Sequence, residues 1–143
     1  MNNRNLFLSI VIVIVAVGFL AFVFDNHAQS KKPDKLCVLW TSGDPDVAHK
    51  VCFMYTLNAK KQGWFDEVNL IVWGPSSRLL AGDKDLQAKV KQMQKAGVIV
   101  EACQACSDSY GVSDKLRQLG VDVKYMGVPL TNMLKSDYKM LNF

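Results

Sequence analysis

Short apolar runs alternate with amphipathic stretches along most of this chain, and this alternation limits the fold more than any other feature. The runs are rich in β-branched residues and mostly apolar on both faces, which is typical of strands covered on both sides. Between them, apolar residues recur at the spacing of a helix, in stripes wide enough to lie on a sheet. The predicted strands are residues 36–40, 68–73, 98–102 and 121–126, and the predicted helices contain residues 48–59, 86–93 and 112–119.

A glycine follows each predicted helix and precedes the next strand, at Gly63, Gly97 and Gly120. A left-handed helix C-cap favours a residue without a side chain, so these glycines mark helix ends. Strands and helices joined by short links imply right-handed crossovers and a mainly parallel sheet with helices on both faces. A chain of 143 residues, 50% of them hydrophobic, has room for one ordinary domain with a core but not for two.

The N-terminal segment departs from this pattern. Residues 6–24 carry no charge and are nearly all strongly apolar, over about the length that spans a bilayer as a helix. We therefore predict a signal anchor over residues 1–24, a polar tether over 25–34 and the globular domain over 35–143. A cleaved secretory signal is the alternative, although residues 26–28 form a poor cleavage site.

The flanks of the apolar segment give conflicting indications of its orientation. Three lysines follow the segment, at Lys31, Lys32 and Lys35, and the positive-inside rule then favours a cytoplasmic domain. The short head before the segment instead has the usual layout of an exported signal anchor. We expect a membrane-anchored domain on the extracytoplasmic (periplasmic) side, with secretion after cleavage or a cytoplasmic-facing domain as alternatives.

The charge of the chain argues against nucleic-acid binding. The net charge is +4, and the lysines are spread along the chain without forming a basic block among aromatic residues. A nucleic-acid partner is therefore not expected.

Two cysteines carry the most informative chemistry. Reactive groups in open parallel sheets gather beyond the carboxyl ends of the strands, and Cys103 stands where the third predicted strand ends and a helical turn begins. The free N–H groups and positive end of a helix favour a thiolate and lower its pKa. Cys106, one turn later, is placed to resolve a mixed disulfide or to form a disulfide with Cys103. We take both as candidate catalytic residues; the alternative is that both are small buried hydrophobes.

The remaining cysteines and histidines do not indicate a metal site. Cys37 lies within a predicted strand and Cys52 on the apolar face of a predicted helix, so both are expected in the core. The two histidines are His27 in the tether and His49. A structural zinc would need two ligands beyond Cys103 and Cys106, and none is well placed. We predict neither a metal nor an organic cofactor.

Candidate substrate-binding residues lie in the other loops at the same end of the sheet. Gly43 follows the first strand, and Ser76 and Arg78 follow the second, at a helix start that favours anions. Arg78 would hold a charged sulfur species or the thiolate, although helix capping alone also explains the serine. Glu101, two residues before Cys103, either relays protons or opposes the thiolate.

Five segments stand out in order along the domain: Thr41-Ser42-Gly43-Asp44, Trp73-Gly74-Pro75-Ser76, Cys103 with Gly111 eight residues later, Tyr125-Met126-Gly127 and Pro129-Leu130-Thr131. In these segments the domain, over roughly residues 35–143, resembles the DsrE-like family of sulfur-relay proteins. The tail is similar to a subgroup with a CxxC sequence.

This resemblance implies a three-layer α/β/α fold with flavodoxin-like layering, for which we predict a mainly parallel sheet of about five strands. It also implies homo-oligomers such as trimers or hexamers, and it places Cys103 on the position that carries sulfur as a persulfide. The chain departs from the characterised relays by adding Cys106 and a membrane segment. Whether Cys106 is resolving or structural stays open.

Three functions follow from these features. The first is a sulfur-relay protein that receives sulfur on Cys103 from a thiol or persulfide donor and passes it to an acceptor thiol. The second is a dithiol/disulfide oxidoreductase, against which stand the intervening Gln104 and Ala105, the lack of a tryptophan before Cys103 and the order of the predicted elements. The third is a non-catalytic oligomeric binding module in which the cysteines are incidental.

Overall fold

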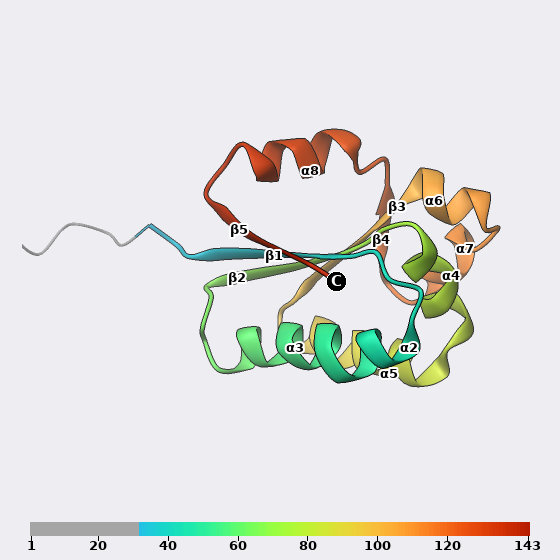
Figure 1. The fold of residues 1–143 in the computed structure, drawn as a ribbon, viewed down its shortest axis with the longest axis horizontal. Coiled ribbons are helices and arrows are strands. Elements are labelled where there is room, and N and C mark those ends of the chain that lie inside the picture. The colour runs from blue at the N-terminus through green and yellow to red at the C-terminus, as the bar shows by residue number, and fades with distance from the viewer. Residues whose placement is uncertain (1–31) are drawn as a thin grey trace, which may run out of the picture. The chain divides into compact units, whose positions relative to one another are not determined.

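The computed structural model describes residues 32–143, and these have the predicted α/β/α architecture (Figure 1). The sheet has five strands in the order β4-β3-β2-β1-β5, and each strand is parallel to its neighbours. The strands are β1 (Lys35–Trp40), β2 (Glu67–Val72), β3 (Ile99–Cys103), β4 (Asp122–Lys124) and β5 (Tyr138–Asn142).

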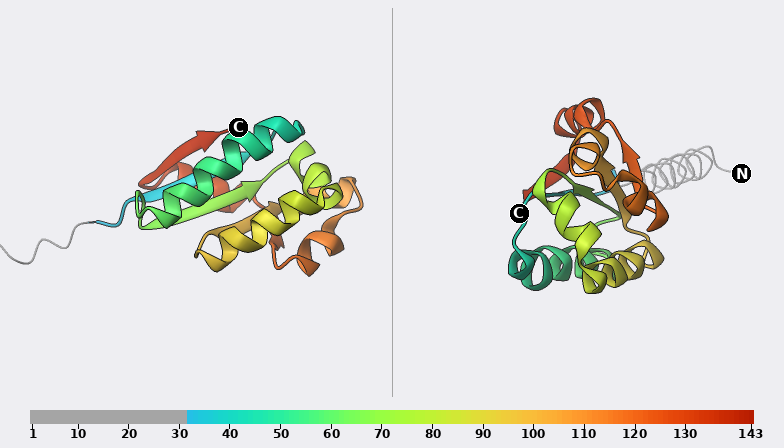
Figure 2. Two further views of the ribbon diagram at one scale, coloured as in Figure 1. Left: turned by 90° about the horizontal axis from the view of Figure 1, so that it is seen from below. Right: turned by 90° about the vertical axis from the view of Figure 1, so that its right-hand side faces the viewer.

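Different helices cover the two faces of the sheet (Figures 1 and 2). The first helical stretch and α5 lie on one face, α8 lies on the other, and α4, α6 and α7 gather near the carboxyl ends of the central strands. The first stretch comprises α2 (Pro45–Val47), a π-helical turn η1 (Ala48–Cys52) and α3 (Phe53–Lys61). The other helices are α4 (Pro75–Gly82), α5 (Lys84–Lys95), α6 (Gln104–Ser109), α7 (Ser113–Gln118) and α8 (Gly127–Leu134).

Local sequence signals account for the helix ends. Asp44 starts the first helical stretch, because its side chain accepts hydrogen bonds from the backbone N–H groups of Asp46, at 2.7 Å, and Val47, at 3.4 Å. The three glycines predicted to end helices all have positive φ, from 65° at Gly63 to 90° at Gly97. The C-cap prediction is therefore confirmed at each position.

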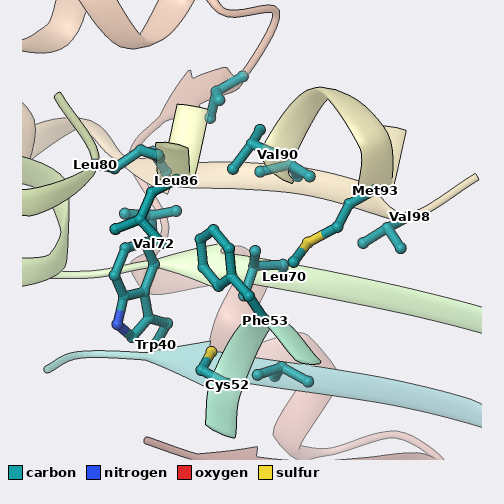
Figure 3. Close-up of a cluster of buried hydrophobic side chains, with 14 of the residues drawn as sticks. Trp40, Cys52, Phe53, Leu70, Val72, Leu80, Leu86, Val90, Met93 and Val98 are labelled. Carbon is teal, nitrogen blue, oxygen red and sulfur yellow. The ribbon is translucent and has the colours of Figure 1, made fainter. Parts of the chain in front are cut away.

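The larger core lies between the sheet and the helices α3 and α5, which cover one of its faces (Figure 3). Trp40 and Phe53 are almost fully buried there, and their rings meet edge to face with centroids 4.8 Å apart. Cys52 belongs to this core, as its predicted apolar-face position implied. We call this cluster the main core.

A smaller apolar cluster lies on the opposite face of the sheet. Its buried members come from three strands and the segment before α8. We call it the sulfur-rich cluster because six of its eleven buried and partly buried members contain sulfur. The buried members are Cys37, Ile71, Cys103 and Met126; the partly buried ones include Trp73, Cys106, Leu130, Met133 and Met140.

The prediction of a parallel, five-stranded α/β fold is confirmed. The predicted fourth strand, residues 121–126, is shorter in the structure, where β4 ends at Lys124. No helix within residues 32–143 is long and apolar enough to cross a bilayer. The predicted membrane segment, residues 6–24, lies outside the described residues.

Candidate functional site

Three loops converge at the carboxyl ends of β1, β2 and β3. The loop after β1 meets the loop after β2, since a Cβ atom added to Gly43 would lie 3.1 Å from the Cβ of Pro75. The loop after β2 meets α6, because the backbone N–H of Gly74 donates a hydrogen bond to the sulfur of Cys106. The predicted segments around Gly43, Ser76 and Cys103 are thus brought together, as a parallel sheet requires.

Cys103 is the last residue of β3 and the N-cap residue of α6. The predicted strand-to-helix junction is therefore present. The thiol is more enclosed than a strand-end position suggests: Cys103 is 4% exposed and its side chain makes no capping hydrogen bond to α6. Its carbonyl oxygen accepts a 2.6 Å hydrogen bond from the Ser107 hydroxyl, which ties the first turn of α6 to the strand end.

Cys106 lies beside Cys103 and is the more exposed of the two. Burial raises the pKa of the Cys106 thiol, and a hydrogen bond with Cys103 raises it further. The N–H of Gly74 acts in the opposite direction by stabilising the thiolate. The net raised pKa means that Cys106 keeps its proton at neutral pH.

The other two cysteines are packing residues. Cys37 and Cys52 are both 0% exposed. Burial raises the pKa of Cys37 to about 12, with a further contribution from the charge of Glu101. Burial also raises the pKa of Cys52 to about 12, against a hydrogen bond with Thr56 that lowers it. Thiols in this state are poor nucleophiles at neutral pH, because the thiolate is the reactive form.

The candidate substrate-binding residues have different surroundings. The Ser76 hydroxyl is buried and lies 2.6 Å from the carbonyl oxygen of Trp40 and 3.0 Å from that of Trp73, so it joins the ends of β1 and β2. Arg78 is exposed, and its guanidinium lies 5.2 Å from the centre of the Tyr110 ring. Arg78 also lines a cavity of about 540 Å³ with residues of α4 and α5 that does not include the cysteines.

A buried polar group lies near Cys103, and the sequence did not identify the partners that hold its carboxylate. Glu101 is 5% exposed, and its carboxylate accepts a 2.7 Å hydrogen bond from the Asn69 side chain. Lys124 forms an ion pair with the same carboxylate. The sequence signals for this group are Asn69 and Glu101, each a lone polar residue in an otherwise apolar predicted strand, and Lys124 in the fourth predicted strand.

Within residues 32–143, no group of three or more histidine, cysteine and acidic side chains is arranged to hold a metal ion.

A model of the DsrE/DsrF-like family matches residues 34–143. The chain belongs to this family. The resemblance drawn from the sequence is thereby confirmed at the level of the family, whereas the CxxC subgroup stays a prediction. The comparison with curated proteins gives no significant match.

Two solved structures resemble this member of the family. A conserved protein of unknown function from Bacteroides thetaiotaomicron is 41% identical, with a TM-score of 0.74, over 77% of this chain and 95% of that one. The ychN protein from E. coli is 18% identical, with a TM-score of 0.58, over 76% of this chain and 99% of that one. The second likeness concerns the fold alone.

Proposed function

We propose that this DsrE/DsrF-like protein carries sulfur as a persulfide on Cys103 and passes it to an acceptor thiol. The observation that carries the proposal is the pair of hydrogen-bonded thiols at the carboxyl end of the sheet, with Cys103 at the junction of β3 and α6 and Cys106 beside it. The family itself is associated with sulfur relay. Cys103, at the strand end and helix start, is favoured as the sulfur carrier over Cys106, whose raised pKa makes its thiolate scarce.

The transfer needs only thiol chemistry. In loading, the Cys103 thiolate attacks the outer sulfur of a donor persulfide; a new S–S bond forms, the donor S–S bond breaks, and the donor leaves as a thiolate. In unloading, an acceptor thiolate attacks the outer sulfur on Cys103, takes it as a persulfide and returns Cys103 as a thiolate. No net oxidation occurs in either step, so no metal or organic cofactor is required.

The surroundings of Cys103 suit a sulfane sulfur. The sulfur-rich cluster contributes the sulfur atoms of Met126, Met133 and Met140 in addition to the cysteines. Thioethers are polarizable and adapt their shape, so they can pack around an added sulfur atom without supplying a nucleophile. Burial also keeps water and oxidants away from a persulfide.

Cys106 gives the site a second possible reaction. Its thiolate, attacking the inner sulfur of the Cys103 persulfide, would form a Cys103–Cys106 disulfide and release hydrosulfide. The raised pKa of Cys106 opposes this reaction at neutral pH, because the attacking thiolate is scarce. The same thiol contact supports a dithiol/disulfide oxidoreductase as the second candidate function.

Sulfur loading of the reduced full chain tests the proposal. After incubation with polysulfide, mass spectrometry should find one added sulfur atom on Cys103. Cys103→Ser should lose this product, and Cys106→Ser should keep it for longer. A dithiol/disulfide oxidoreductase would instead lose its redox cycle in both variants. Cys52→Ala is the matched control, because Cys52 is buried in the main core. Loading that persists without Cys103 would refute the proposal.

We also propose that residues 6–24 anchor the domain on the extracytoplasmic side of a membrane, where it works as a homo-oligomer, such as a trimer or hexamer, with donor and acceptor thiol proteins. The support is the uncharged apolar sequence of this segment. The full chain should stay in the pellet after alkaline extraction. Protease added to spheroplasts should degrade the domain; protection until lysis would place it in the cytoplasm.

A further inference from the structure

A buried carboxylate stands on the same face of the sheet as the reactive thiol. Glu101 and Cys103 are two residues apart on β3, so their side chains point to the same side. Glu101 is 5% exposed, and a buried charge is tolerated only when it is paired and hydrogen-bonded. Its two oxygens have separate partners: Asn69 donates to Oε2 and the Lys124 ammonium meets Oε1.

Lys124 is also the strand neighbour of Cys103. In the pairing of β3 with β4, Cys103 is level with Lys124, and Glu101 is level with Asp122. Neighbouring parallel strands are about 4.8 Å apart, and a lysine carries its charge on a flexible four-carbon stem. The ammonium therefore lies within reach of the Cys103 sulfur, although its present partners are Glu101 and, at 2.7 Å, Asp122.

The charge balance on this face has a consequence for an anionic sulfur on Cys103. Without a cation, Glu101 would repel a thiolate or persulfide anion, as it already raises the pKa of Cys37. Hydrogen bonds with the Asp122 and Glu101 carboxylates raise the pKa of Lys124, which stays protonated. The titratable and charged groups that share this face come from the strands and α6, and α8 carries none. They are Cys37 from β1, Glu101 from β3, Asp122 and Lys124 from β4, Tyr138 from β5 and Cys106 from α6. Lys35 and Glu67 lie at the far ends of β1 and β2.

We propose that Lys124 is the positioning cation for the anionic sulfur of Cys103, and that Glu101 and Asp122 hold the ammonium ready beside it. When Cys103 carries a thiolate or persulfide anion, the ammonium turns toward that sulfur. When the sulfur is neutral or has been passed on, the ammonium rests on the two carboxylates. This inference rests on the proposed role of Cys103 and adds the group that stabilises the charge on its sulfur.

The pH dependence of Cys103 alkylation tests this role in the full chain. With iodoacetamide as the probe, mass spectrometry separates the Cys103 product from the Cys106 product. Lys124→Met should raise the pH midpoint of Cys103 alkylation by about one unit, equivalent to about tenfold less thiolate below the midpoint. Lys124→Arg should restore most of the shift, and Glu101→Gln should lower the midpoint, because the ammonium is freed.

The decisive comparison is Lys124→Met in the Glu101→Gln background. There the buried carboxylate is gone, so both variants avoid an unpaired buried charge and should fold. A lysine that acts on the sulfur directly should still raise the midpoint by about one unit when it is removed. An unchanged midpoint would overturn the inference, because Lys124 would then act only by neutralising Glu101.

Lys35→Met is the matched control. Lys35 pairs with Glu67, at 3.2 Å, on the same face but at the opposite end of the strands. Its removal should leave the Cys103 midpoint unchanged. The measurement needs no persulfide: failure of sulfur loading with an intact Lys124 effect would refute the proposed function alone, and loading without a Lys124 effect would refute this inference alone.

Discussion

The two faces of the sheet differ in what they bury. The main core, beneath α3 and α5, contains aromatic and branched aliphatic side chains, with Trp40 packed edge to face on Phe53. The opposite face buries a smaller cluster with several sulfur atoms, and next to it a carboxylate, Glu101, held by an amide and an ammonium. This division assigns stability mainly to one face and leaves the other free to hold polar and ionisable groups that would destabilise a core.

Truncating one large side chain on each face should give the largest contrast in stability. Phe53→Ala should reduce the free energy of unfolding by about 3–5 kcal/mol, because it removes a buried ring and leaves a cavity. Met133→Ala, on a partly buried member of the sulfur-rich cluster, should cost less than half as much. Urea unfolding of the compact unit Pro33–Phe143 measures both. Equal losses would remove the distinction between the faces.

The next largest contrast in stability should be between two ion pairs at opposite ends of the sheet face that carries the sulfur-rich cluster. Lys124→Met leaves the buried Glu101 charge without its cation and should reduce the free energy of unfolding by about 2–4 kcal/mol. Lys35→Met breaks a pair in which both side chains are about one-third exposed, and should cost less than about 1 kcal/mol. The same unfolding experiment at low and high salt compares them. A loss for Lys124→Met no larger than that for Lys35→Met would contradict the burial argument.

High pH should weaken both faces together, because each buries one packing thiol. The pKa values of Cys37 and Cys52 are raised to about 12, from 9.0 in an unfolded chain. The folded state then binds these protons more tightly than the unfolded chain does. The two thiols therefore make their full contribution to the free energy of unfolding below pH 9, and this contribution is lost as the pH rises toward 12. The slope should approach about 1.4 kcal/mol per pH unit for each thiol. Cys52→Ala should reduce the slope by about half; an unchanged slope would exclude this thiol as a source.

The smallest expected effect concerns the contact between the two site thiols. Cys103→Ala removes the hydrogen-bond partner of Cys106, and with it one cause of the raised Cys106 pKa. The pH midpoint for alkylation of Cys106 should therefore fall, while burial keeps it above that of a free cysteine. Alkylation kinetics followed by mass spectrometry measure the midpoint. No change would show that the thiols do not interact, and a rise would contradict the direction of their interaction.

The sequence predicted the central part of the fold better than its edges. Strands β1, β2 and β3 lie within one residue of their predicted ranges, since long buried strands leave a continuous apolar run. The strands β4 and β5 lie at the edges of the sheet, where each has one neighbouring strand, and polar residues interrupt their apolar pattern. For that reason β4 is shorter than predicted, and β5, although included in the expected count, was not located along the chain.

The candidate site shows the same limit. Cys103 and Cys106 were identified from local spacing, because a strand end and a helix start are local features. The partners of Glu101 were not identified, since Asn69 and Lys124 reach it only through the order of the strands β2, β3 and β4. The low exposure of Cys103 was also missed, because it depends on residues contributed by several strands and by the segment before α8.

The 4% exposure of Cys103 sets a limit on the kinetics of any reaction at its sulfur. A donor must wait for a local opening of the surrounding side chains, and openings of this kind have their own rate. At high donor concentration, the loading rate should stop rising and equal the opening rate. Small donors, which need a smaller opening, should saturate at a higher rate than donors that present their sulfur on a protein.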